Sequence, residues 1–456
     1  MKFLKRFFDR GTVKTFFTVL FLLLVSFFIR LPGFYLPHNH GDQIQYLALA
    51  MKLDNSGLGG YNLRGVNLQQ DDREIVLGLF PAEEGSRGTL LGQFPLYYDA
   101  PLFHKPPLFP YALMLSHKLF ASYKPYVAVQ RDLGLKVLYI RLKTLPKVKI
   151  LFNAQFYCTI VPVFFSLLLI TATFFMGKLL FSHTSGFYAA MLLSFSPIPL
   201  LTSQRIWADD MLAFFILMAF ILYYLARERR NTFLSVLAGV CCGLAILTKP
   251  NGNVAIFIIL IYSLWKDRKF TKILLAFLGP CLIFAFLWYL QLFKTYGSFF
   301  YMPMFKQDYY GGNHPWFDFV LNRPWYIYIV NTVAQTPLFF FMYLAVPVVF
   351  KRSISEEVRK DKDKKLFLLL WIFLFILVFI ISKVGRESRY ILPAYPAIAI
   401  LSAEVIFTIQ KKINKVLSRY LGTFIVVIAI TASSFWSLSV GWNYVMKNRA
   451  IVKVPY

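Results

Sequence analysis

The sequence predicts an all-α polytopic integral membrane protein. Of its 456 residues, 58% are hydrophobic and 18% are aromatic, and the mean hydropathy is +0.57, well above that of a soluble globular chain. Apolar stretches of about 20 residues, the length that a helix needs to cross the hydrocarbon core, recur along the chain. Short basic segments separate several of these stretches, which is typical of cytoplasmic loops.

Eleven stretches are candidate membrane-spanning helices, and together they indicate one transmembrane domain over residues 1–456 without an internal repeat. They are expected at residues 12–30, 155–177, 186–203, 211–226, 232–248, 251–265, 273–292, 327–350, 366–382, 390–409 and 420–441. Two longer external loops are expected, at 31–154 and 293–326. Within the first loop, PPLFPYALMLSHKLF is apolar but short and is predicted to be a helix lying in the membrane interface.

The positive charges set the expected orientation. The basic start MKFLKRFFDRGTVK should stay in the cytoplasm, and the basic loops 227–230, 266–272, 351–365 and 411–419 then fall on the same side. The net charge of +27 therefore reflects cytoplasmic loops and contact with anionic lipid headgroups. A nucleic-acid partner is excluded, because no separate polar domain is present to bind it.

Acidic and basic residues gather where spans meet the external side, and they suggest an enzyme. A site at a bilayer surface can take one substrate from lipid, and a polyprenyl-phosphate-linked sugar is the obvious lipid-borne donor there. Lys105, Arg205 and Arg389 can bind its leaving phosphate as cationic hydrogen-bond donors. Asp42 is placed to take the proton of the acceptor hydroxyl.

Five motifs in order resemble GT-C glycosyltransferases, above all the protein O-mannosyltransferases and the aminoarabinose transferases of lipid A. They are DQIQY, HKPPLFPY, SQRIWADDMLAFF, LTKPNG and RESRYILPAYPAIAI, and the resemblance covers about residues 30–410. It implies an inverting hexosyl- or pentosyltransferase with a polyprenyl-phosphate sugar donor. The acceptor it implies is a lipid, a glycan or a protein.

The resemblance also assigns residues. It implies that Asp42 is the catalytic base and that Lys105 contacts the donor phosphate. Arg389 and Tyr390 match the family's Arg-Tyr pair and are also expected to bind the donor phosphate. The family's second aspartate aligns with either Asp209 or Asp210. This chain departs from the pattern at Gln43, where members commonly carry a second acid, so a role that needs two adjacent carboxylates is not expected.

Two further expectations concern a metal ion and a rival function. His40 and His104 are candidate ligands of a divalent metal ion, since one lies in an HxHxD pattern and the other precedes Lys105. The rival function is a secondary transporter or lipid flippase, which would place polar groups near the bilayer midplane and show repeated halves. The enzyme is expected to be multi-pass, in the inner or plasma membrane if prokaryotic, with its active site on the external face.

Overall fold

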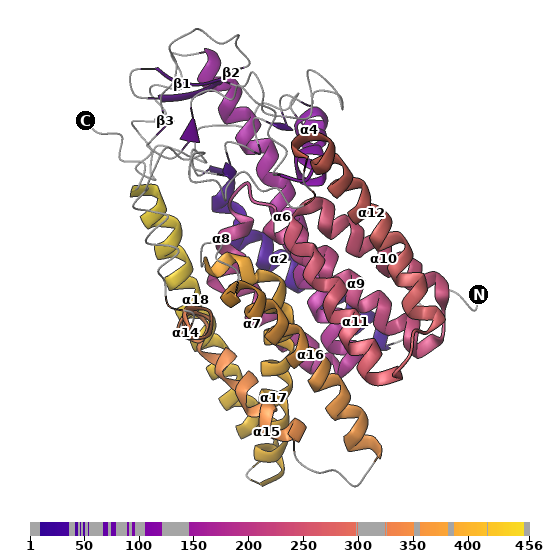
Figure 1. Cartoon of the computed structure of the whole chain (residues 1–456). Coiled ribbons are helices and arrows are strands. Elements are labelled where there is room, and N and C mark those ends of the chain that lie inside the picture. Colours follow the sequence, from indigo (N-terminus) through magenta and orange to yellow (C-terminus); the bar gives the residue numbers. More distant parts are fainter. Residues whose placement is uncertain are drawn as a thin grey trace, which may run out of the picture.

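The structure is a computed structural model of the chain (Figure 1). It describes residues 10–35, 42–43, 46, 49–50, 53, 67–71, 74–78, 89–90, 94–95, 105–120, 146–297, 299, 324, 326–350, 356–381, 387–416 and 418–450.

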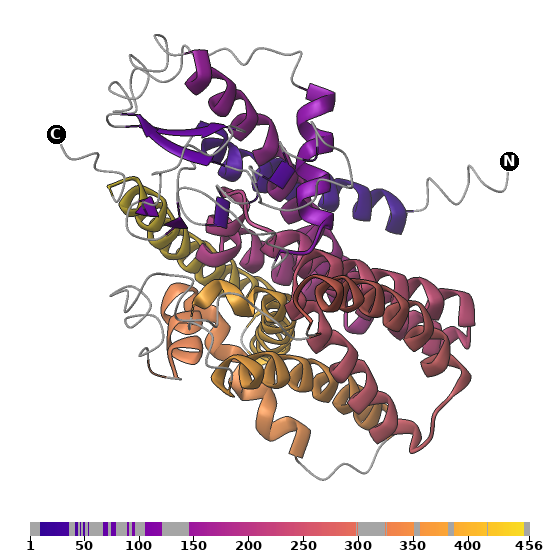
Figure 2. The same cartoon turned by 45° about the horizontal axis from the view of Figure 1, so that its top comes forward.

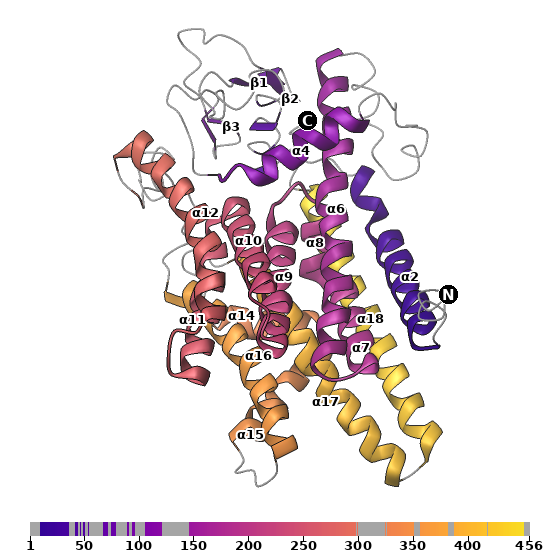
Figure 3. The same cartoon turned by 90° about the vertical axis from the view of Figure 1, so that its right-hand side faces the viewer.

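Helices dominate these residues and run largely along one bundle (Figures 1 and 3). The first half comprises α2 (Arg10–Arg30), η1 (Leu31–Tyr35), α4 (Leu108–Phe120), α6 (Pro146–Leu180), α7 (His183–Phe195), α8 (Pro197–Ser203), α9 (Asp209–Arg229), α10 (Thr232–Thr248) and η4 (Pro250–Gly252). The second half comprises α11 (Asn253–Asp267), α12 (Lys272–Tyr296), α14 (Ile327–Gln335), η7 (Pro337–Leu344), α15 (Ala345–Phe350), α16 (Glu356–Ile381), η8 (Ser388–Ala394), α17 (Tyr395–Val416) and α18 (Arg419–Ala450).

The chain is a multi-pass membrane protein, but the predicted count of eleven spans is not confirmed. Among the described residues, seven helices are long and apolar enough to cross a membrane, and the bent pair α7 and α8 makes an eighth. The pair bends by 62° where Pro197 begins α8, since proline cannot continue the hydrogen bonding of the preceding helix. Helices α10 and α11 have only 17 and 15 residues, and the expected span 327–350 divides into α14, η7 and α15.

The first predicted external loop contains more regular structure than expected. Two antiparallel hairpins lie there, β1 (Asn67–Asp71) with β2 (Glu74–Gly78) and β3 (Thr89–Leu90) with β4 (Phe94–Pro95). Strand β2 lies against α6, which begins at Pro146, nine residues before the predicted span (Figure 2). The predicted interfacial segment is helix α4, which packs on α6, and the Ser116 hydroxyl donates a 2.7 Å hydrogen bond to the Tyr157 carbonyl.

Close backbone approach holds neighbouring helices of the bundle together. Lipid is as apolar as leucine, so membrane helices associate through shape matching, and small residues permit the tightest contacts. Helices α6 and α7 meet at Gly177 and Gly186, where a Cβ added to Gly177 would lie 2.7 Å from the Gly186 Cα. Helix α9 lies inside, between α6 and α10, with Phe220 edge-on to the fully buried Trp371 of α16.

The outer surface of the bundle is apolar. Large hydrophobic side chains on α2, α12 and α18 are more than half exposed, among them Phe28, Ile283 and Phe424. In a soluble chain such a surface would aggregate, whereas here it faces the lipid. The position of the core and of the lipid-facing surface therefore agrees with a membrane-embedded bundle.

Gly186→Ala should lower the free energy of unfolding by about 1–3 kcal/mol, because the added methyl group meets the backbone of α6 at Phe174 and Lys178. The matched control is Gly279→Ala in α12, where nothing lies within 4 Å of the added Cβ. Thermal unfolding in detergent measures both. Equal midpoints for the two variants would contradict close α6–α7 packing.

Candidate functional site

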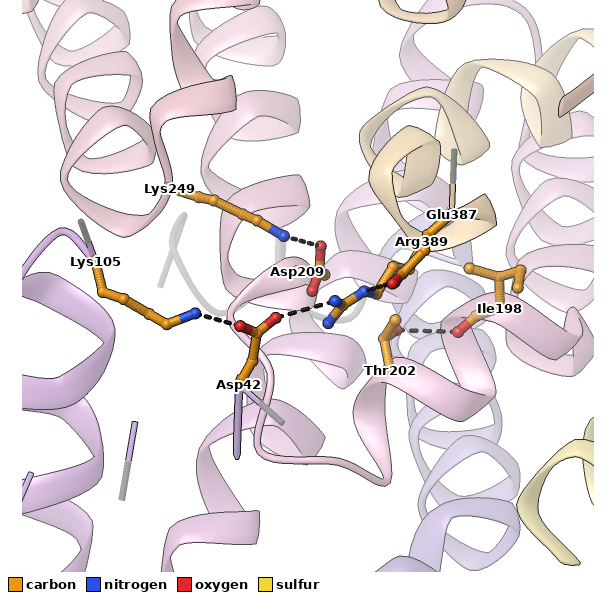
Figure 4. Close-up of polar contacts among 8 residues, drawn as sticks. All are labelled: Asp42, Lys105, Ile198, Thr202, Asp209, Lys249, Glu387 and Arg389. Carbon is orange, nitrogen blue, oxygen red and sulfur yellow. Dashed lines mark hydrogen bonds and ion pairs between the residues drawn. The ribbon is translucent and has the colours of Figure 1, made fainter. Parts of the chain in front are cut away.

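Three distant parts of the chain meet at Asp42. The Lys105 ammonium lies 2.5 Å from Asp42 Oδ1, and Arg389 Nη2 lies 2.9 Å from Asp42 Oδ2, so each carboxylate oxygen has its own cation (Figure 4). Asp42 follows the first helix, Lys105 lies just before α4, and Arg389 lies in η8. The Asp42 side chain is 30% exposed whereas those of its two partners are 9% and 10% exposed, so the carboxylate is the accessible member.

Arg389 lies in a 3-10 segment that directly precedes a membrane-spanning helix. Residues Ser388–Ala394 form the 3-10 helix η8, which contains Pro393 and leads into α17. The Arg389 Nε donates to Glu387 and its Nη2 to Asp42, while its Nη1 is buried without a hydrogen-bond partner among the described residues. Because a guanidinium offers five donors in a rigid fork, Arg389 can bind two carboxylates and still offer an N–H group.

A second ion pair lies beside the first. The Lys249 Nζ, at the end of α10, donates a 2.7 Å hydrogen bond to Asp209 Oδ1 in the first turn of α9 (Figure 4). The partial positive charge of a helix N-terminus favours a carboxylate at this position. The same ammonium lies 5.0 Å from the ring centroid of Tyr390, which connects this pair to η8. Its charge also reaches Asp42.

The two candidate aspartates, Asp209 and Asp210, lie in different surroundings. Asp209 faces Lys249 and the charges around Asp42, whereas Asp210 is fully buried near Thr202, Ser166 and Arg30. Adjacent helix positions lie about 100° apart around the axis, so the two carboxylates enter different surroundings. Asp209 therefore lies beside the charges around Asp42, whereas Asp210 lies near Arg30 of α2.

The remaining predicted cation, Arg205, lies in the turn between α8 and α9. Its guanidinium carbon is 5.4 Å from the Trp207 ring centroid, and that of Arg389 is 4.1 Å from the same centroid. Two guanidinium groups therefore share one indole, an arrangement favoured by the negative potential of the ring face. Arg205 makes no ion pair within the part of the chain that the structure describes.

Sequence reasoning gave no role to Lys249, Trp207 or Glu387, although all three contact predicted site residues. The motifs contained a signal for each of them. Lys249 is the lysine of LTKPNG, Trp207 lies in SQRIWADDMLAFF, and Glu387 is the second residue of RESRYILPAYPAIAI.

Asp42 and Arg205, which both lie outside the membrane spans, have perturbed acidity. Burial alone would raise the pKa of Asp42, but the positive charges of Lys105, Arg389 and Lys249 outweigh it and hold the pKa well below its usual range. Burial, with a smaller contribution from Arg389, lowers the pKa of Arg205 to about 10. Asp42 is therefore an anion and Arg205 a cation at neutral pH.

The predicted metal ligands His40 and His104 lie outside the described residues, so that site stays a prediction. Within the described parts of the chain, no group of three His, Cys, Asp or Glu residues is close enough to hold a metal ion. Gln43 is fully buried beside Asp42, and its amide has no hydrogen-bond partner among those same residues.

Comparison with known proteins identifies the fold. The family described as dolichyl-phosphate-mannose-protein mannosyltransferase matches residues 145–299. ArnT from Cupriavidus metallidurans, in the apo state, superposes with a TM-score of 0.53 at 15% identity, covering 92% of this chain and 64% of that one. The archaeal oligosaccharyltransferase AglB from Archaeoglobus fulgidus, in complex with an inhibitory peptide and a dolichol-phosphate, superposes with a TM-score of 0.58 at 14% identity, covering 94% and 56%.

The chain has the GT-C fold. This confirms the resemblance and the fold class predicted from the five motifs. A protein of unknown function from Aquifex aeolicus (strain VF5) is 26% identical over 265 residues, which are 57% of this chain and 50% of that protein. The chain thus matches about half to two thirds of the length of these relatives.

Lys249→Met should lower the free energy of unfolding by about 3 kcal/mol, because it leaves Asp209, whose side chain is 2% exposed, without its cation. That is the lower end of the range for a broken buried pair, since Arg389 remains nearby. Lys249→Met combined with Asp209→Asn should recover most of the loss. Lys266→Met is the control, since it breaks an exposed pair with Asp363 and should have an effect of at most about 1 kcal/mol. Unfolding in detergent measures the stability of each variant. An equal loss of stability in Lys249→Met and Lys266→Met would contradict a buried Asp209–Lys249 pair.

Proposed function

We propose that this protein is a membrane glycosyltransferase that moves a sugar from a polyprenyl-phosphate-linked donor to an acceptor hydroxyl on the external side. One observation carries the proposal: a partly exposed carboxylate, Asp42, bound by two nearly buried cations at one end of an apolar bundle. The family match and the GT-C fold support the reaction class. The AglB relative, in complex with a dolichol-phosphate, supports the class of lipid carrier.

The residues of the site suit an inverting transfer. Asp42 takes the proton of the acceptor hydroxyl, whose oxygen bonds to the anomeric carbon from the face opposite the phosphate. The bond between that carbon and the phosphate oxygen breaks, and the electron pair leaves with the phosphate. Lys105 and Arg389 stabilise the charge that develops on this leaving group. The polyprenyl phosphate departs as a stable anion, so no strong general acid is required.

The same cations hold Asp42 before the donor binds, so donor binding must come before Asp42 can act as a base. Lys105 and Arg389 already bind one carboxylate oxygen each, so a phosphate can engage them fully only by replacing the carboxylate. Arg205, which has no carboxylate partner among the described residues, is the cation available for a first contact. We infer that donor phosphate takes over the cations and thereby releases Asp42 as the base.

The charges at the other end of the bundle support an external site. The turns 227–230 and 266–272, rich in Lys and Arg, lie at the far ends of α9 and α11 from Asp209 and Lys249. Cytoplasmic loops carry such an excess. The acceptor on the opposite side is then a lipid, a glycan or a protein hydroxyl, and the transferred sugar is a hexose or a pentose.

Asp42→Asn should reduce transfer by about 10²–10⁴-fold, because asparagine keeps the shape of aspartate but cannot take the proton. The assay follows labelled sugar leaving a purified polyprenyl-phosphate donor, and it separates an enzyme from a transporter or flippase, which would leave the donor intact. Asp363→Asn is the matched control, since it also removes a 30% exposed, ion-paired carboxylate, but on α16. Wild-type turnover by Asp42→Asn would place the base elsewhere.

The release of Asp42 should be visible in the pH dependence. The base works when ionised, so activity is lost as the pH falls through its pKa, and that pKa is depressed while Lys105 and Arg389 hold the carboxylate. The acid limb of kcat/KM reports the pKa of Asp42 in the free enzyme, and the acid limb of kcat reports its pKa in the donor complex. Because the donor phosphate takes the cations away from Asp42, the acid limb of kcat should lie at higher pH. Lys105→Met should move the kcat/KM limb upward. If the acid limbs of kcat/KM and kcat fall at the same pH in the wild-type enzyme, this would contradict the replacement of the Asp42 carboxylate by donor phosphate.

Orientation is tested by labelling. A cysteine introduced at Asn67 in β1 should react with a membrane-impermeant thiol reagent on intact cells, and one at the exposed Lys269 only after permeabilisation. Wild-type protein is the background control, because Cys158, Cys242 and Cys281 are buried but Cys241 is only half-buried. The reverse pattern would place the site in the cytoplasm.

A further inference from the structure

We propose that the turn between α6 and α7 binds the phosphate of an acidic phospholipid, at the end of the bundle away from the candidate active site. The site, called here the basic turn cluster, consists of Lys14 of α2, Lys178 of α6 and His183 of α7, with the hydroxyls of Thr15 and Thr18. Figure 3 shows the N-terminal end of α2 beside the junction of α6 and α7, far from the hairpins at the opposite end. This inference does not depend on the proposed enzymatic function.

The cluster is assembled from segments far apart in sequence. The Lys178 Nζ donates a 2.8 Å hydrogen bond to Thr15 Oγ1, and the His183 ring lies 3.4 Å from Thr18 Oγ1. Lys14 and Lys178 are both close enough to His183 for their charges to act on it. Two lysines and a histidine from three helices therefore lie near one another at this turn.

No acid on these helices neutralises the cluster. Helices α2, α6 and α7 contain no aspartate or glutamate in their sequences. Among the acids of neighbouring described helices, Asp361 pairs with Lys365 and Asp363 with Lys266, while Glu404 accepts hydrogen bonds from Thr408 and from Ser185 in the first turn of α7. None of the described ion pairs joins an acid to Lys14 or Lys178. Like charges gathered without an acid are unfavourable unless an anion joins them.

Helix capping accounts for a neighbouring lysine but not for the cluster. Cations are favoured at helix C-termini. Lys364 fills that role at the end of α6, since its Nζ donates a 2.6 Å hydrogen bond to the Leu180 carbonyl. The Lys178 ammonium instead points across to α2, where it bonds Thr15. The start of α7, capped by Ser182, adds the positive end of a helix dipole next to His183.

The surroundings indicate a lipid rather than a soluble anion. Phe16 and Phe17 on α2 are each 61% exposed, and Phe175, one turn before Lys178 on α6, is 43% exposed. The two spans Gly11–Phe34 and Tyr157–Leu180 end at this point, so the basic groups lie at headgroup level and the aromatic rings at acyl-chain level. A lipid with an anionic headgroup and apolar acyl chains can contact both the basic groups and the aromatic rings. Acidic phospholipids are abundant on the cytoplasmic side.

The experiment measures lipid binding to the purified full-length protein in neutral detergent by native mass spectrometry. Wild-type protein should bind dioleoyl phosphatidylglycerol more tightly than dioleoyl phosphatidylcholine. Lys14→Gln combined with Lys178→Gln should weaken phosphatidylglycerol binding by about 30-fold, or about fivefold for each lysine removed. The matched control, Lys411→Gln with Lys412→Gln, removes two basic residues of α17 and should bind as wild type does.

Three results would overturn the proposal: no preference for phosphatidylglycerol in the wild type, an unchanged preference in the double variant, or an equal loss in the control. Inorganic phosphate is added as a competitor, and displacement of the lipid at equal concentration would show a site for free anions instead. Lys178→Arg, which keeps the charge, should retain binding. Lys14→Gln alone changes an exposed side chain, so its fivefold effect remains measurable if the double variant does not fold.

Discussion

The pairing of one carboxylate with two cations at the end of an apolar bundle is the interaction on which the rest of the site depends. Asp42 brings Lys105 and Arg389 close together although both are almost buried, and without its negative charge the two cations would repel each other. Buried charges are stable only when each has a partner of opposite sign. Glu387 is accordingly paired with Arg389, and Asp209 with Lys249. The ion pairs thereby join the first external segment to α9, α10 and η8.

Helix ends place these charges. Irregular backbone at membrane depth is tolerated where it is buried in protein or lines a cavity. Asp209 begins α9 after the bent pair α7 and α8, Lys249 comes directly before Pro250, and Arg389 lies in the 3-10 helix that contains Pro393. Prolines interrupt three helical segments at one end of the bundle, which leaves polar side chains free to meet there instead of pointing into lipid.

The two ends of the bundle differ in how their charges are balanced. Around Asp42, acids and bases alternate and bind one another, with Arg205 as the described cation that lacks a carboxylate. At the turn between α6 and α7, basic side chains meet hydroxyl groups and no acid of their own helices. The first arrangement suits the exchange of one anion for another during a reaction, whereas the second suits the permanent binding of an anion at the membrane surface.

The sequence alone determined the class of the protein and the identity of most of the charged groups. Hydrophobic length locates helices because a span must be long enough to cross lipid, and five motifs in order indicated the GT-C fold. Asp42, Lys105, Arg205, Arg389 and Tyr390 were all named from these motifs, and the structure brings them to one end of the bundle.

Only the tertiary structure decided how the groups are paired and where helices break. The motifs could not separate Asp209 from Asp210, because one step along a helix changes which neighbour a side chain meets. They gave no role to Lys249 or Trp207, whose contacts come from packing between α8, α9, α10 and η8. The predicted count of eleven spans was not confirmed for a similar reason, because hydropathy measures only the composition of a stretch. The bend at Pro197 and the shortness of α10 and α11 depend on local backbone geometry and on packing within the bundle.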